Sequence, residues 1–223
     1  MMTKARTVLV AAIAAALLEA PRTVRGAADA EWLQWGGPHR NFMSDVKGLA
    51  SSWPASGPKR LWTRALGEGH SSILVEDGRL YTMYRPLGTL SLVRRSQEEV
   101  VASIEAATGK TIWEFKYPAP TDGVDFSQGA GPHSTPLIVG SHLYATSSRR
   151  ELFALDKATG RRLWSHDFMK EYGAPRLDRG YACSPLFYNG TIIVTVGGPG
   201  QAIAAFNQQT GALVWKGGDS QTS

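Results

Sequence analysis

One eleven-residue pattern occurs three times in this chain and constrains its fold more than any other feature. Each copy holds an acidic residue or an asparagine, then a Thr-Gly pair, and ends in a tryptophan. The copies are SIEAATGKTIW, ALDKATGRRLW and AFNQQTGALVW, beginning at residues 103, 154 and 205. With one earlier tryptophan, the aligned residues are Trp62, Trp113, Trp164 and Trp215, each 51 residues after the last. A constant step of this size indicates a repeat architecture.

A second landmark precedes each copy. The segments HSSILVEDGRLYTM, HSTPLIVGSHLYAT and CSPLFYNGTIIVT share a hydroxyl-bearing residue near their start, namely Ser72, Thr135 and Ser184. These residues step by 63 and then by 49. An insertion, RPLGTLSLVRRSQEE (85–99), explains the longer first step, so the equal first tryptophan interval is partly coincidental.

Each repeat unit is predicted to form four short strands. In the second unit they are STPLIV, HLYATSS, ELFALD and RRLWSHDF, which mix β-branched, aromatic and aliphatic residues between turn signals. No segment after residue 30 keeps a helical period over three turns. Four antiparallel strands in 40 to 50 residues form a propeller blade.

The sequence therefore predicts an all-β, incomplete β-propeller. We expect three full blades over residues 70–117, 133–168 and 182–217, and one lone outer strand, KRLWTRAL, around Trp62. A propeller needs at least about four blades to close. We interpret the chain as the N-terminal half of a seven- or eight-bladed protein.

The repeated pattern itself is predicted to be the outer hairpin of a blade. The turn glycines Gly109, Gly160 and Gly211 permit a positive φ, and Thr159 and Asp156 can hydrogen-bond the local backbone. Trp62, Trp113, Trp164 and Trp215 would each lie between adjacent blades and bury roughly 200 Å² of ring surface. A single blade has two apolar faces and needs its neighbours to bury them.

The first thirty residues are predicted to be a secretory signal peptide. A basic start is followed by the apolar run VLVAAIAAALL and by AADA, a signal-peptidase pattern. A buried N-terminal helix is the alternative. The expected organisation is a signal peptide over 1–30, an irregular segment over 31–59 and a partial propeller over 60–223. This organisation predicts a periplasmic or secreted protein.

Charge and cysteine content exclude several classes. The net charge of +5 falls to +3 once residues 1–30 are removed. No run of Lys and Arg after residue 30 is longer than two residues, so nucleic-acid binding is not expected. No later segment is apolar enough to span a membrane. Cys183 is the single cysteine and cannot form an internal disulfide. The densest charge run, VRRSQEEV (93–100), is predicted to be a solvated insertion.

The motif Ala-x-Asp-x-x-Thr-Gly-x-x-x-Trp resembles the tryptophan-docking motif of the PQQ-like β-propeller repeats, in the quinoprotein alcohol dehydrogenase-like superfamily. The segment WLQWGGPHRNFMS (32–44) is similar to the start of its secreted bacterial members. The resemblance implies PQQ with Ca²⁺ as a cofactor and oxidation of an alcohol or sugar. It also implies a vicinal cysteine pair and a Glu/Asn/Asp set, which no stretch of this sequence matches.

The candidate functional surface consists of three loops, GEGHSS (67–72), FSQGAGPHST (126–135) and RLDRGYACS (176–184). Each leads from an outer strand to the next innermost strand, so in a propeller they cluster on one face, at the mouth of the axis. They would bring together His70, His133, Arg176, Asp178, Arg179 and Tyr181. The alternative is that their glycines serve the turns and their polar side chains are only solvated. No catalytic residue and no metal site are predicted, since the histidines lack paired spacing and no Gly-x-Ser-x-Gly occurs.

Three functions remain open at this point. The first is a secreted binding or scaffolding module with a protein partner on the propeller face. The second is a fragment of a PQQ-dependent dehydrogenase, and the third is a non-functional gene fragment. Whether the chain is an enzyme stays open, although its residues favour a non-enzyme. The sequence indicates neither the ligand nor the oligomeric state.

Overall fold

The computed structural model describes residues 31–88, 95–127, 129 and 131–220. The signal peptide predicted over residues 1–30 lies outside the described residues. Within them, the fold is nearly all β, with three four-stranded antiparallel sheets and one short helix. This confirms the predicted fold class.

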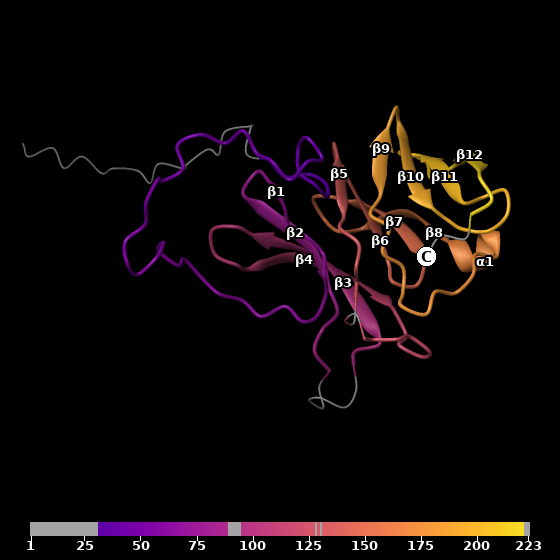
Figure 1. Cartoon of the computed structure of the whole chain (residues 1–223), viewed down its shortest axis with the longest axis horizontal. Coiled ribbons are helices and arrows are strands. Elements are labelled where there is room, and N and C mark those ends of the chain that lie inside the picture. The colour runs from indigo at the N-terminus through magenta and orange to yellow at the C-terminus, as the bar shows by residue number, and fades with distance from the viewer. Residues whose placement is uncertain (1–30, 89–94, 128, 130, 221–223) are drawn as a thin grey trace, which may run out of the picture.

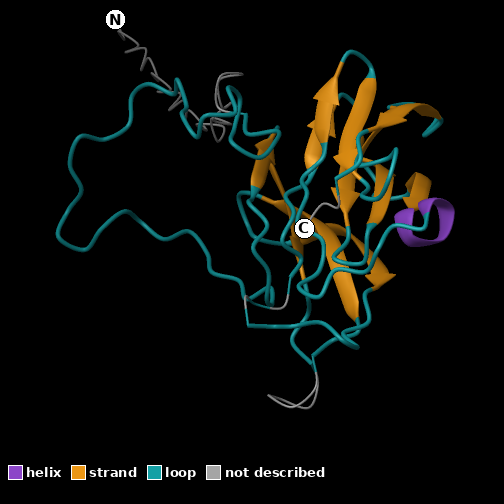
Figure 2. Cartoon of the chain, turned by 45° about the vertical axis from the view of Figure 1, so that its right-hand side comes forward, coloured by secondary structure: helices purple, strands orange, loops and turns teal. Residues whose placement is uncertain are grey.

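The sheets follow one another along the chain (Figure 1). The first holds β1 (Leu74–Glu76), β2 (Arg79–Tyr84), β3 (Glu98–Glu105) and β4 (Thr111–Pro118). The second holds β5 (Leu137–Val139), β6 (His142–Thr146), β7 (Glu151–Asp156) and β8 (Arg162–Asp167). The third holds β9 (Leu186–Tyr188), β10 (Thr191–Thr195), β11 (Ile203–Asn207) and β12 (Leu213–Gly217). Helix α1 (Phe168–Tyr172) follows β8, and Figure 2 shows it beside the strands.

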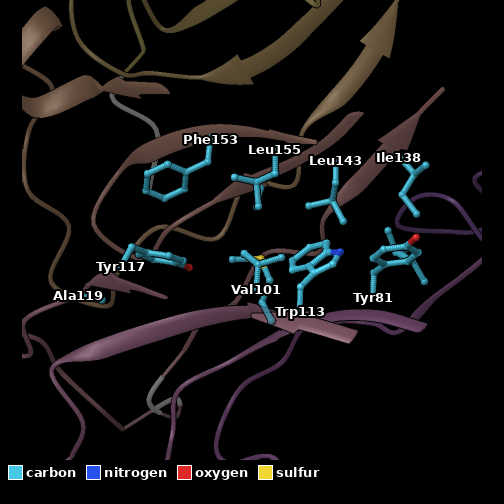
Figure 3. Close-up of a cluster of buried hydrophobic side chains, with 12 residues drawn as sticks. Tyr81, Val101, Trp113, Tyr117, Ala119, Ile138, Leu143, Phe153 and Leu155 are labelled. Carbon is cyan, nitrogen blue, oxygen red and sulfur yellow. The ribbon is translucent and has the colours of Figure 1, made fainter. Parts of the chain in front are cut away.

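Neighbouring sheets bury their apolar faces against each other. Figure 3 shows Tyr81, Val101 and Trp113 of the first sheet opposing Leu143 and Leu155 of the second. A second core joins the second and third sheets and includes Leu137, Tyr144, Leu152, Ile192, Val194 and Phe206. Each sheet therefore stabilises the next, as expected for a repeat whose single unit cannot bury both faces.

The three described turns of the repeat hold tryptophans of the preceding unit. The indole N–H of Trp62 donates to Ala106 O at 2.8 Å, that of Trp113 to Lys157 O at 3.0 Å, and that of Trp164 to Gln208 O at 3.2 Å. A Cβ added at the turn glycine would come within 2.5 to 2.8 Å of ring atoms. This holds for Gly109, Gly160 and Gly211.

The variable residue of the motif has one local role. Asp156 Oδ1 accepts from both the amide (2.8 Å) and the hydroxyl (2.7 Å) of Thr159, and Asn207 Oδ1 makes the same two contacts with Thr210 at 3.0 and 3.2 Å. The hydrogen bond from the Thr159 side chain helps to lower the pKa of Asp156. In the first copy the Glu105 carboxylate accepts from the Thr108 hydroxyl. Any side chain that offers an acceptor oxygen serves the turn, which explains why glutamate, aspartate and asparagine each occur there.

The hydroxyl residues of the second landmark link the sheets near the axis. The amide of Ser72 donates to Thr135 Oγ1 at 3.0 Å, and the amide of Thr135 donates to Ser184 Oγ at 2.9 Å. Ser134 Oγ turns instead to Thr146 O at 2.6 Å. The amides of Ser72 and Thr135 thus donate to the next unit and not to a strand of their own sheet. The innermost strands are therefore only three residues long, shorter than the strand STPLIV predicted for the second unit.

The segment around Trp62 differs from the prediction. KRLWTRAL was expected to be a lone outer strand, but its residues, 59–66, form no strand in the described part of the chain. A strand is defined by its ladder of hydrogen bonds, and no described strand pairs with this segment to provide one. The Trp62 ring still docks on the turn of the first sheet.

An N-terminal segment crosses all three innermost strands. Trp32 and Val75 exchange two backbone hydrogen bonds of 2.9 Å, and Leu33 O accepts from Ile138 N at 2.8 Å. Arg40 Nη2 then donates to Phe187 O at 3.1 Å. Residues 32–40 therefore form a strap that ties the sheets together along their inner edges.

Replacing Gly160 with alanine should destabilise the protein by about 3 kcal/mol. The residue has a φ of 73°, where a side chain costs about 1 to 2 kcal/mol, and the new methyl group would collide with the Trp113 ring. Urea unfolding measures the loss.

Gly190→Ala is the matched control. Gly190 has a φ of 74°, but an added Cβ there would meet no atom within 4 Å. It should cost only the backbone strain, about 1 kcal/mol. Equal unfolding midpoints for the two variants would show that the ring contact contributes nothing.

Candidate functional site

Two of the three candidate loops meet through a pair of histidines. The rings of His70 and His133 stack with centroids 4.9 Å apart and planes 23° from parallel. The amide of His70 also donates to Pro132 O at 2.9 Å. The loops before β1 and β5 are therefore held together at one end of the first and second sheets.

The second histidine of the pair is held neutral. Burial lowers the pKa of His133, and the neighbouring His70 and Arg85 lower it further, while Glu99 acts in the opposite direction. The unfolded chain therefore binds a proton at this ring more readily than the folded chain. The contribution of the neutral His133 ring to the free energy of unfolding is therefore fully present at neutral pH, and it is lost as the pH falls below about 6.5.

The third loop is tied to Gly123 and Asp125, which come directly before the second loop. The amide of Asp125 donates to Asp178 O at 2.6 Å, and Arg179 Nε lies 3.5 Å from Asp125 Oδ2. The Arg176 guanidinium packs against Gly123, where an added Cβ would lie 2.5 Å from Nη2. The structure thus gathers Arg176, Asp178 and Arg179 with the second loop, beside rather than within the histidine pair.

Tyr181 is not part of this surface. It is 1% exposed in the core between the second and third sheets, and burial raises its pKa well above the usual value. Its hydroxyl hydrogen-bonds Thr195 of β10. The prediction placed it at the mouth because its loop lies there, but the apolar ring packs inward, where it gains more by burial.

A buried ion pair lies beneath the loops, and sequence reasoning missed it. Arg85 Nη2 contacts Glu99 Oε1 at 2.8 Å, and the side chains are 2% and 0% exposed. Glu99 Oε2 also accepts from the Tyr117 hydroxyl at 3.0 Å and from the Ser148 amide at 3.1 Å. Arg85 Nη1 donates to the carbonyl oxygens of Ser96 and Ala119, at 2.6 and 2.8 Å.

This pair corrects the interpretation of the charge run at 93–100. Glu98 and Glu99 begin strand β3, and Val100 is fully buried. The carboxylate of Glu99 joins the first sheet to Ser148 in the second. The one sequence signal was a charged residue next to apolar Val100 and Val101, since a charge beside a buried strand needs a partner.

The cofactor implied by the resemblance does not fit the residues present. Cys183 is the only cysteine of the sequence, so a vicinal pair cannot form. Among the described residues, no three His, Cys, Asp or Glu side chains gather closely enough to hold a metal ion. The strap at 32–40 also hydrogen-bonds the inner strands that face the axis. We therefore derive no chemical step through PQQ or Ca²⁺.

Removing one partner of the buried pair should be costly. We expect Arg85→Met to destabilise the fold by about 3 to 5 kcal/mol, because it leaves the Glu99 carboxylate buried and uncompensated. The double variant Arg85→Met, Glu99→Leu should recover part of that loss. Chemical denaturation of the wild type, of Arg85→Met, of Glu99→Leu and of the double variant completes the cycle, and strictly additive losses would argue against coupling between the two residues.

Several known proteins are similar to this chain. The dehydrogenase subunit of alcohol dehydrogenase (quinone) from Gluconobacter oxydans is 34% identical over 155 residues, which is 66% of this chain and 17% of that protein. The outer membrane protein assembly factor BamB of Yersinia pestis is 26% identical over 161 residues, 71% of this chain and 36% of its own length. BamB of Shewanella oneidensis is 35% identical over 68 residues, 30% and 17% of the two chains.

Solved structures give weaker matches. A europium-containing methanol dehydrogenase is 17% identical over 66% of this chain and 24% of its own, with a TM-score of 0.45. BamB of Moraxella catarrhalis is 13% identical over 69% of this chain and 62% of its own, with a TM-score of 0.35.

The chain spans 17 to 36% of the length of these sequence relatives. In the part of the chain that the structure describes, no helix is long and apolar enough to cross a membrane. The model of a protein family described as outer membrane protein assembly factor BamB matches residues 97–223, more than half of the chain. With its three sheets and repeated docked tryptophans, the chain belongs to this family of PQQ-like β-propeller repeat proteins.

Proposed function

We propose that this protein is a periplasmic or secreted binding and scaffolding module whose protein partner docks on the loop face. The observation that carries the proposal is the joining of loops from three repeat units into one surface. The stacked His70 and His133 join the first and second loops, and the backbone bond from Asp125 to Asp178 joins the second and third.

Further contacts support a preformed surface. Arg95 lies over the Phe126 ring at 4.4 Å and pairs with Glu68 at 3.3 Å, so residues before β1, before β3 and before β5 meet there. Arg179 and Asp125 keep 67% and 48% of their side chains exposed. Exposed charges on loops held by a rigid sheet scaffold suit recognition of a protein with complementary charges.

The family to which the chain belongs also supports a scaffolding function. Its model is described as an assembly factor, and two of the relatives above are assembly factors by name. A scaffold needs a defined surface and no reactive constellation, and the described residues offer the first. The proposed envelope location rests on the predicted signal peptide and is consistent with the relatives named as outer membrane protein assembly factors.

Site-specific photocrosslinking in the producing bacterium tests the proposal. A crosslinking residue at Arg179 or His70 should yield the same protein adduct, because both positions lie on the loop face. The same residue at Lys116, a 55% exposed side chain on outer strand β4, serves as the control and should yield none. Adducts that are equal at all three positions, or absent from the loop positions, would contradict the proposal.

The second candidate is a fragment of a PQQ-dependent dehydrogenase that oxidises an alcohol or sugar. The identity of 34% to the Gluconobacter enzyme favours it. We expect this 223-residue chain not to bind PQQ tightly, since a quinone site on a propeller axis takes groups from blades all around it. Titration of PQQ with Ca²⁺, followed by tryptophan fluorescence, measures this. Saturable binding below about 1 μM, some −8 kcal/mol, would favour the enzyme over the scaffold.

A further inference from the structure

A cavity of about 320 Å³ opens where the outer strands of the first and second sheets end. Its walls come from the end of β4, the turn between β6 and β7, and the junction of β8 with α1. The lining residues are Pro118, Pro120, Arg149, Glu151, Asp167, Met169 and Lys170. The volume lies at the lower end of small-ligand pockets, which span about 300 to 1,000 Å³, and so suits a small ligand.

Two of the four charged residues in this cavity neutralise each other. Lys170 Nζ lies 2.7 Å from Asp167 Oδ2. Asp167 also caps α1, since its Oδ1 accepts from the Lys170 amide at 3.1 Å. This pair is therefore engaged in holding the helix and is not available to a ligand.

The other two charges, Arg149 and Glu151, remain for a ligand. Within the described residues, neither side chain makes an ion pair, and the Glu151 carboxylate accepts one hydrogen bond, from Ser147 Oγ at 3.2 Å. Between them, Arg150 adopts a φ of 64° and is itself buried against Val196 O. Among the described residues, the cavity therefore presents one cation and one anion without ion-pair partners, two residues apart on one tight turn.

The carboxylate also lacks full solvation. Burial raises the pKa of Glu151, and Asp167 across the β7–β8 ladder also raises it, whereas the hydrogen bond from Ser147 and the charge of Lys170 act in the opposite direction without cancelling the rise. A partly desolvated carboxylate gains more from an added cation than a fully solvated one does. The remaining wall is apolar, because Pro118, Pro120 and Met169 contribute rings and a thioether but no charge.

We propose that this cavity binds a small zwitterion of the α-amino-acid class with an apolar side chain. The ligand's ammonium group pairs with Glu151, its carboxylate pairs with Arg149, and its side chain packs on Pro118, Pro120 and Met169. A molecule with a single charge would leave one of the two protein charges unpaired. The inference does not rest on the proposed scaffold function, because the site lies on other residues.

Isothermal titration calorimetry at pH 7 tests the site with three probes of one shape. L-leucine carries both charges, isoamylamine only the ammonium, and 4-methylpentanoate only the carboxylate. We expect saturable binding of leucine, and binding of either single-charge probe at least about tenfold weaker. A tenfold change in affinity corresponds to about 1.4 kcal/mol.

Variants assign the binding to the two residues. Glu151→Gln keeps an acceptor for Ser147, and Arg149→Gln shortens the side chain and removes its charge. Each should weaken leucine binding at least about tenfold, while Lys116→Gln, outside the cavity, should leave it unchanged. Urea unfolding of each variant shows whether it is folded, and both substitutions should leave the midpoint close to that of the wild type.

Three results would overturn the proposal. The first is no saturable binding of leucine up to about 10 mM, near −3 kcal/mol. The second is equal binding of leucine and a single-charge probe, which would indicate a simple ion site. The third is unchanged leucine binding in a folded Glu151→Gln or Arg149→Gln variant, which would place the ligand elsewhere.

Discussion

The contact between an indole ring and the glycine of the next repeat is the interaction on which the rest of this structure depends. In three copies the ring lies so close to the glycine that no side chain fits between them, and its N–H binds a carbonyl of the same turn. The contact sets the distance and angle between successive sheets. The ring of Trp215, by contrast, is 46% exposed, since no described turn packs against it.

Once the sheets are set side by side, the other links follow. The apolar faces meet in two cores, and hydroxyl groups that lie just before the innermost strands accept hydrogen bonds across units. The strap at residues 32–40 hydrogen-bonds each of the three innermost strands. The buried pair of Arg85 and Glu99 joins the first two sheets at the end where the loops emerge. The loop face is therefore built on the end of these two sheets that the buried ion pair holds together.

The loop face and the cavity differ in what they offer. The loop face presents exposed charges over stacked and hydrogen-bonded loops, which suits a macromolecular partner. The cavity between Pro118 and Lys170 is small and holds two opposite charges without partners, which suits a small zwitterion. Neither resembles a quinone site, because this chain lacks the cysteine pair and the described residues lack a metal-binding cluster.

The sequence by itself determined the all-β class, the four-stranded unit and the number of units, because these depend on local periodicity and on turn residues that repeat at a fixed spacing. It also predicted which loops would emerge at one end. Only the tertiary structure decided that Glu99 pairs with Arg85, that Tyr181 turns into the core and that residues 59–66 form no strand. The sequence likewise did not predict that residues 32–40 form a strap across the innermost strands. Each of these depends on a partner distant in the chain or on a neighbouring strand, and a pattern of nearby residues carries no information about which distant group will satisfy a charge, a ring or a backbone amide.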